Sequence, residues 1–179
     1  MIFCETPLAS SYLICPERRE DERGYFARTF CVEEFAAHGL LLDVKQCNVS
    51  YNRLSGTVRG MHFQRAPRAE AKLVRCTRGA IFDVIVDLRP GSPTYCHWHG
   101  AELTEVNGHS LFVPEGFAHG FQTLADGSEV FYQMFAWYSP EHADGVRWDD
   151  PVFGIRWPLP ITSIAERDRT FPLLQDRRC

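Results

Sequence analysis

Several features of membrane, secreted and zinc-binding proteins are missing from this sequence. No apolar run approaches the ~20 residues that span a bilayer, and no basic region followed by an apolar stretch begins the chain. The seven cysteines are scattered and odd in number, and no CxxC pair suggests structural zinc. We therefore expect no signal peptide and no membrane partner, and a cytoplasmic protein whose thiols are free.

An excess of positive charge is also missing. The chain has 19 Lys and Arg against 23 Asp and Glu, a formal net charge of −4. Such a chain has no general attraction for nucleic acid, so an anionic ligand would have to be held by individually placed arginines and lysines. The sequence contains no repeat, low-complexity segment or linker, and its 179 residues fit a single domain, 1–179, with its own apolar core.

Helical signal is sparse in this chain. Val32–His38, followed by Gly39 as a C-cap, predicts one short helix, and Ser163–Asp168 predicts a turn or a second one. Glycines and prolines separate short β-rich runs, among them Ala80–Leu88, Leu111–Pro114, Phe121–Leu124 and Glu129–Tyr138. The pattern predicts an all-β antiparallel sandwich or barrel, with few exposed edges and a ligand cavity at its mouth.

The most informative stretch is Gly56–Gln64, GTVRGMHFQ. In a strand, simple alternation places His62 and Gln64 on one face and Arg59 on the other, unless a bulge at Gly60 resets the register. His62 on an inward face beside a glycine could be a catalytic base. It could equally be a core histidine with satisfied hydrogen bonds.

Other side chains could carry chemistry or be structural. Lys72 has apolar neighbours, so it is either a surface lysine or an ammonium that stabilises an oxyanion in a cavity. His119, in PEGFAHGF, could line a pocket or only hydrogen-bond its turn. Tyr132 and Tyr138 lie in an aromatic run, where a tyrosine at the strand end could be a general acid. Asp168, in SIAERD, could orient a histidine if the tail folds back over the barrel.

A metal site is the alternative suggested by His97-Trp98-His99. Alternation places both histidines on one strand face, and Glu102 and His119 could supply further ligands. Trp98 lies between the pair, and the chain turns at Gly100, so we expect no bound metal.

Taken together, the motifs resemble the dTDP-4-dehydrorhamnose 3,5-epimerase family. The patterns RGxHxQ, PxGxAHGF and WxDP occur in the family's order along nearly the whole chain. The matching segments are Asp21–Phe26, Gln46–Ser50, Gly56–Gln64, Lys72–Arg75, Gly79–Leu88, Pro114–Phe121, Tyr138–Glu141, Arg147–Pro151, Gly154–Pro158 and Glu166–Asp168.

The resemblance implies a cupin-type antiparallel β-barrel (jelly roll) and a homodimer that exchanges N-terminal segments. It also implies catalysis without a cofactor, and inversion of C3, C5 or both in a nucleotide-linked 4-keto-6-deoxy hexose. The alternatives are a single-centre epimerase, a 3,4-ketoisomerase, a metal-dependent cupin oxygenase and a non-catalytic sugar-binding cupin. Ketoisomerases of this superfamily tend to carry a second histidine where this chain has Gln64, which favours epimerisation.

The resemblance also suggests a role for each site residue. His62 is the base, in a dyad with Asp168, and Lys72 lies beside the enolate oxygen. Tyr138, preferred over Tyr132 because it stands just before Ser139-Pro140, is the acid. The remaining residues bind substrate: Arg23 and Arg59 hold the diphosphate, and Phe26, Gln46, Asn48 and His119 line the nucleotide and sugar pocket.

Two positions depart from the family pattern. Cys47 stands where members often have aspartate, and Trp137 lies beside the expected acid. Neither change removes a catalytic group, but both leave the identity of the nucleotide and of the sugar open.

Overall fold

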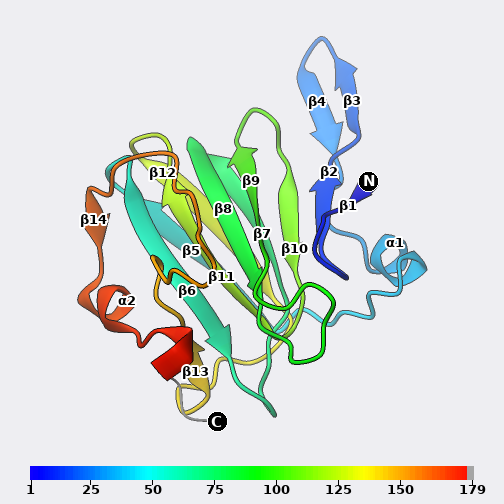
Figure 1. The fold of residues 1–179 in the computed structure, drawn as a ribbon. Coiled ribbons are helices and arrows are strands. Elements are labelled where there is room, and N and C mark those ends of the chain that lie inside the picture. The colour runs from blue at the N-terminus through cyan, green and yellow to red at the C-terminus, as the bar shows by residue number, and fades with distance from the viewer. Residues whose placement is uncertain (177–179) are drawn as a thin grey trace.

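Two sheets packed face to face form the body of the protein in the computed structural model, which describes residues 1–176 (Figure 1). Sheet one has the order β1 (Ile2–Glu5), β2 (Tyr12–Cys15), β10 (Ser110–Val113), β7 (Lys72–Arg78), β12 (Ser128–Met134) and β5 (Gln46–Asn52). Sheet two has the order β13 (Ala143–Gly145), β6 (Thr57–Gln64), β11 (Phe117–Thr123), β8 (Ala80–Asp87) and β9 (Trp98–Thr104), and β14 (Ser163–Ile164) also pairs with β6. This arrangement confirms the predicted cupin-type, all-β fold, although β14 runs parallel to β6.

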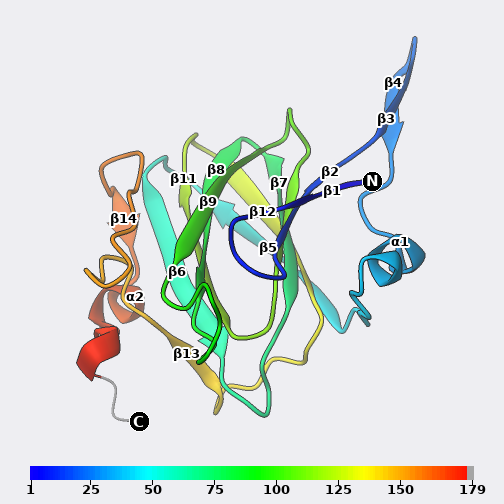
Figure 2. The same cartoon turned by 45° about the vertical axis from the view of Figure 1, so that its right-hand side comes forward.

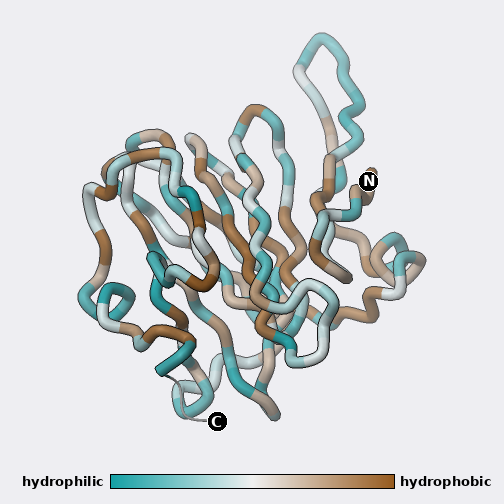
Figure 3. The backbone as a smooth tube through the Cα atoms, in the orientation of Figure 1, coloured by the Kyte–Doolittle hydropathy of each residue, from teal (hydrophilic) through white to brown (hydrophobic). Residues whose placement is uncertain are grey.

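A third, two-stranded sheet stands away from the body. It is the hairpin of β3 (Arg18–Asp21) and β4 (Gly24–Ala27), which projects beyond both main sheets (Figure 2). Figure 3 shows that this hairpin is largely hydrophilic, whereas hydrophobic residues follow the strands of the body. The hairpin is therefore not held by the core of its own chain.

The helices are short. Helix α1 (Val32–Ala37) confirms the predicted N-terminal helix, and Gly39 follows it with a φ of 76° and donates its N–H to the carbonyl of Ala36. The predicted C-terminal turn or helix is resolved into strand β14 followed by α2 (Glu166–Thr170) and the 3₁₀ turn η1 (Leu174–Asp176). Within residues 1–176, no helix is long and apolar enough to cross a membrane.

The main hydrophobic core lies between the two sheets. Alternate residues of β8, such as Ile81 and Ile85, point inward because successive side chains of a strand face opposite sides. Residues of sheet one, such as Val74 and Val130, meet them from the other side. Two smaller clusters cover the outer faces, one under the C-terminal segment and one under α1 and the N-terminus.

Two strand boundaries differ from the sequence expectation. Strand β11 begins at Phe117, four residues earlier than predicted, and it is buried on both faces, so its sequence shows no alternation. Strand β12 ends at Met134, which pairs with Gln46 and Lys72, the first residues of β5 and β7. With no partner strand beyond that point, Tyr138 lies in the following loop.

Candidate active site

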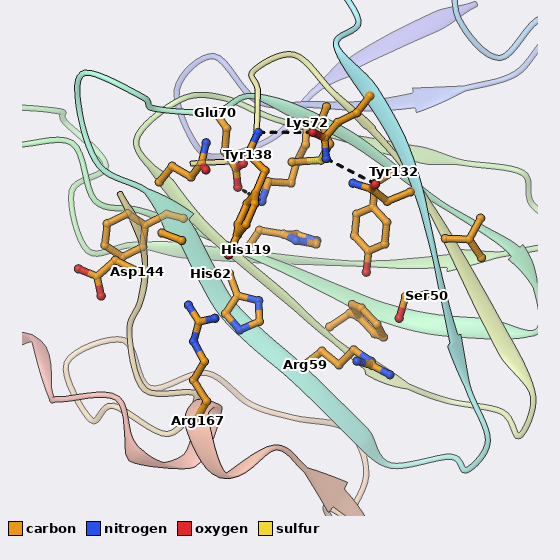
Figure 4. Close-up of a pocket in the computed structure, with 18 residues that line it drawn as sticks. Ser50, Arg59, His62, Glu70, Lys72, His119, Tyr132, Tyr138, Asp144 and Arg167 are labelled. Atoms are coloured by element: carbon orange, nitrogen blue, oxygen red, sulfur yellow. Dashed lines mark hydrogen bonds and ion pairs between the residues drawn. The ribbon is translucent and has the colours of Figure 1, made fainter. Parts of the chain in front are cut away.

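A cavity of about 360 Å³ opens between the two sheets (Figure 4). This is within the range of about 300–1,000 Å³ that is typical of small-molecule sites. Strands β5, β7 and β12 supply one wall and β6 and β11 the other, while α2 and the loop after β12 flank the opening. The cavity contains most of the predicted site residues: Gln46, Asn48, Arg59, His62, Lys72, His119 and Tyr138.

A bulge in β6 brings Arg59 and His62 to the same cavity. His62 pairs with His119 and Arg59 pairs with Phe121, so two residues of β6 lie opposite one residue of β11. Gly60, between them, has a φ of 137°, and a Cβ there would lie 2.5 Å from the Cα of Gly120. Only a glycine fits this close approach of the two backbones. Simple alternation along β6 is therefore interrupted, and the bulge considered at Gly60 from the sequence is confirmed.

His62 is held by the C-terminal tail. Its Nε2 lies 2.7 Å from Oδ1 of Asp168, and the other carboxylate oxygen of Asp168 accepts the N–H of Gly60 at 3.1 Å. The His62 side chain is 42% exposed whereas that of Asp168 is 6% exposed. Burial raises the pKa of Asp168, but the hydrogen bonds from His62 and Gly60 outweigh it, so the pKa lies below its usual value. The tail thus presents an oriented imidazole to the cavity.

Lys72 points into the cavity and is not a surface lysine. It is 5% exposed, and its Nζ donates to Oε1 of Glu70 at 2.7 Å. Glu70 is also buried and also lines the cavity. The pair places an ammonium in a site of low dielectric constant, where it acts strongly on a negative oxygen.

His119 forms a second histidine–aspartate pair. Its Nε2 lies 2.8 Å from Oδ1 of Asp83, and both residues are buried. The His119 ring also meets the ring of Tyr132 edge to face, with centroids 6.2 Å apart and an interplanar angle of 83°. His119 therefore belongs to the cavity and does not merely hydrogen-bond its turn.

Two tyrosines line the cavity, one on a strand and one in a loop. Tyr132 is on β12, partly buried against the main core, and burial raises the pKa of its phenol above the usual value. Tyr138 lies in the loop and is 58% exposed, and its backbone N–H donates to Oε1 of Gln46. Tyr132 therefore faces the cavity from a strand, and Tyr138 faces it from a loop at the rim.

The cavity is rich in cations although the chain is acidic. Arg59 and Arg167 lie on one side of it and Lys72 on the other (Figure 4). The guanidinium of Arg59 is fixed by the side chain of Asn52 at 2.7 Å. Basic residues are thus placed individually at the cavity, as an anionic ligand would require.

Arg23 and Phe26 do not reach the cavity of their own chain. They lie on the projecting hairpin, where Arg23 contacts Asp21 and Phe26 is 69% exposed. A substrate-binding role for these two residues requires the cavity of another copy.

The residues of the metal alternative are dispersed. His97 and His99 are outside the cavity lining, and His119 is engaged by Asp83. Among residues 1–176, no group of three or more His, Cys, Asp or Glu side chains is arranged to hold a metal ion.

The six cysteines in this range are free, and Cys179 lies outside the described residues.

Several residues at or beside the cavity have no role predicted from the sequence. Arg167 stands directly between Glu166 and Asp168, and Glu70 is two residues before Lys72. Asp83 carried a detectable signal, since it interrupts the apolar alternation of Ile81 and Ile85. Further such lining residues are Ser50, Phe63, Phe121, Met134, Ala143 and Asp144.

A jelly-roll sandwich with a sugar-sized cavity that holds two imidazoles, an ammonium and two phenols defines an acid–base enzyme of the cupin class. The family model for dTDP-4-dehydrorhamnose 3,5-epimerase matches residues 5–176, and the chain belongs to this family. A dTDP-4-dehydrorhamnose 3,5-epimerase of Sinorhizobium fredii is 47% identical over 175 residues, covering 97% of this chain and 90% of that protein.

Solved structures agree with this assignment. The dTDP-4-dehydrorhamnose 3,5-epimerase of Bacillus anthracis, solved with TDP and PPi bound, is 40% identical with a TM-score of 0.93, covering 97% of this chain and 99% of that one. A 3'-monoepimerase of Streptomyces bikiniensis, solved with dTDP as a histidine and tyrosine double mutant, is 29% identical with a TM-score of 0.88. The two chains are covered to 96% and 86%.

Proposed function

We propose that this epimerase inverts C3, C5 or both in a dTDP-linked 4-keto-6-deoxy hexose, with His62 as the base. The observation that carries the proposal is the His62–Asp168 pair, because its imidazole is oriented by a buried carboxylate and exposed to the cavity. A neutral imidazole can accept a proton from a carbon next to the ketone. Asp168 then stabilises the imidazolium that forms.

Lys72 is the group we assign to the enolate. When a proton leaves C3 or C5, the electron pair moves through the C4 carbonyl and negative charge develops on its oxygen. An ammonium fixed in a buried site stabilises such an oxygen without reorganising. One enolate oxygen serves both flanking carbons, so a single cavity can act on either.

Inversion needs a proton donor on the opposite face of the sugar. Tyr138 is the acid suggested by the sequence, and it lines the cavity. Tyr132 has the stronger structural support, because it is on strand β12 and its ring packs edge to face against His119 in the cavity. In the Streptomyces bikiniensis double mutant, the replaced histidine and tyrosine stand 70 positions apart, as His62 and Tyr132 do here. We therefore favour Tyr132 as the acid, with Tyr138 as the rim tyrosine.

The nucleotide end of the substrate needs cations and flat surfaces. We assign the diphosphate to Arg59, with Arg167 on the same side of the cavity, the walls of the nucleotide pocket to Gln46 and Asn48, and the sugar end to His119. The relative from Bacillus anthracis binds TDP and PPi, which supports a diphosphate subsite in this fold.

A homodimer would complete the site. The projecting hairpin carries Arg23 and Phe26 away from its own cavity, with Tyr25 and Phe26 more than half exposed. We propose that this hairpin reaches the cavity of a second copy, where Arg23 adds to the diphosphate site and Phe26 to the nucleotide pocket. The free cysteines support a reducing, cytoplasmic setting for this assembly.

Single-centre epimerisation is the main alternative, because the similar chain from Streptomyces bikiniensis is a 3'-monoepimerase. A 3,4-ketoisomerase has less support. Gln64, the position of the expected second base, donates to the carbonyl oxygens of Arg68 and Trp137 and accepts the N–H of Ser139. These bonds fix Gln64 as a structural residue of the cavity edge.

Incubation with dTDP-4-keto-6-deoxyglucose in D₂O, followed by NMR, tests the proposal. We expect deuterium at C3, C5 or both in the wild type, and loss of exchange by a factor of about 10² to 10⁴ in His62→Asn. His109→Asn, which changes a histidine outside the cavity lining, is the control. Undiminished exchange in His62→Asn would remove His62 as the base, and the labelled positions identify the centres on which the enzyme acts.

A further inference from the structure

Asp83 is a carboxylate at a position where the fold expects an apolar side chain. It lies on β8 between Ile81 and Ile85, on the face that packs into the main core, and it is 0% exposed. Placing a charge there costs several kcal/mol unless partners compensate for the lost water. A buried carboxylate that supports only the fold would be expected to have all its hydrogen bonds satisfied.

Asp87, on the same face of the same strand, meets that expectation. It is also 0% exposed, and its two oxygens accept hydrogen bonds from Arg89, Ser92 and Thr94. Burial raises its pKa, but these bonds lower the pKa far more. Asp87 therefore closes a structural network at the end of β8, and its partners lie outside the cavity lining.

Asp83 is bonded quite differently. Its Oδ1 pairs with Nε2 of His119, and its buried Oδ2 has no hydrogen-bond partner in the described part of the chain. The single partner is a cavity residue. The cost of burying this carboxylate is thus only partly compensated by hydrogen bonds, and its one bonded oxygen contacts a residue of the active site.

The position of His119 shows what such a carboxylate would control. His119 pairs in register with His62 across β6 and β11, so the two imidazoles are neighbours on the same wall. Its ring also meets Tyr132, whose pKa is raised by burial and by the negative charge of Asp83. Asp83, His119 and Tyr132 come from β8, β11 and β12 and converge beside the base.

We propose that Asp83 is a positioning residue of the active site, which fixes the ring orientation and tautomer of His119 toward the sugar. A carboxylate only accepts hydrogen bonds, so Nε2 of His119 carries a proton and Nδ1 is the ring nitrogen available to a ligand. Nδ1 then accepts a hydrogen bond from a sugar hydroxyl next to the carbon that reacts at His62. This inference rests on the proposed function and names a further part of the same site.

The test compares Asp83→Asn with Asp87→Asn, two isosteric changes on one strand. For Asp83→Asn we expect kcat/KM to fall by at least about tenfold, because the sugar is misplaced, while the affinity for dTDP alone stays within about twofold. Asp87→Asn should lower the Tm without changing kcat/KM per folded molecule. A wild-type kcat/KM in Asp83→Asn, or equal losses in both variants, would overturn the proposal.

A measurement on the unmodified protein does not depend on either variant folding. In ¹⁵N NMR of the histidine rings, with His119 assigned from His119→Gln, we expect a protonated Nε2 and a Nδ1 resonance that shifts when unreactive dTDP-glucose binds. A shift at Nε2 alone, or none at either nitrogen, would contradict the assigned orientation. Failure of the wild type to exchange deuterium on the 4-keto substrate would instead refute the proposed function, and the ring measurement would still decide the role of Asp83.

Discussion

His62 and His119 stand opposite each other on β6 and β11, and each ring is held through its Nε2 by a different aspartate. Asp168 reaches His62 from the C-terminal helix α2, whereas Asp83 reaches His119 from the neighbouring strand β8. The first pair is open to the cavity and the second is buried. This difference agrees with the proposed roles, in which His62 transfers protons and His119 holds the sugar.

The two tyrosines can be separated by single substitutions. Tyr132→Phe should lower inversion by about 10² to 10⁴-fold while His62 still removes protons, so deuterium exchange with retained configuration becomes visible. Tyr138→Phe should mainly change KM, since the exposed rim ring keeps its surface. NMR of the products in D₂O distinguishes exchange from inversion. The reverse pattern would transfer the acid role to Tyr138.

Replacing Lys72 should lower activity by more than the accompanying loss of stability can account for. Lys72→Met removes the group beside the enolate oxygen, and we expect kcat to fall by about 10² to 10³-fold. The same change leaves Glu70 buried without its partner, which also lowers the free energy of unfolding. Lys72→Met combined with Glu70→Gln should recover stability but not activity. Recovery of both would show that Lys72 is only structural.

The stability contributed by Asp168 should depend on pH with a definite sign. Its pKa in the folded protein is lowered, so the native carboxylate stabilises the fold above the unfolded value of about 3.9 and loses this contribution as pH falls through the folded value. Asp168→Asn should be less stable than the wild type at pH 7, and the gap should close below about pH 4. Urea unfolding across this range measures it, with Asp149→Asn as an exposed control. A gap that is independent of pH would contradict the assignment.

Mixed dimers can show whether the projecting hairpin serves a second copy. One protomer carries His62→Asn, and the other carries Arg23→Ala with Phe26→Ala, so each homodimer lacks a required part of its site. After random exchange of subunits, mixed dimers should have one intact site, which restores about a quarter of all sites. Activity that stays at the level of the separate variants would place the hairpin outside the partner's cavity.

The sequence predicted the β architecture and helix α1 because turn residues and strand-like runs are local signals. His62, Lys72 and Asp168 were found through motifs, and the structure brings all three to one site. Local patterns could not show that β12 ends at Met134, since its end is set by the first residues of β5 and β7. The partnership of Asp83 with His119 depends on the same long-range register.

The bulge at Gly60 places the imidazole of His62 and the guanidinium of Arg59 on one short length of β6, tied to β11 on one side and to β13 and β14 on the other. Their backbones belong to one hydrogen-bonded segment of the sheet. If Arg59 anchors the diphosphate and His62 is the base, as proposed above, the hexose is the moving part, and each carbon beside the ketone is turned toward His62 by rotation about the sugar–phosphate linkage. How freely that rotation occurs would decide whether one stereocentre or two are inverted before release.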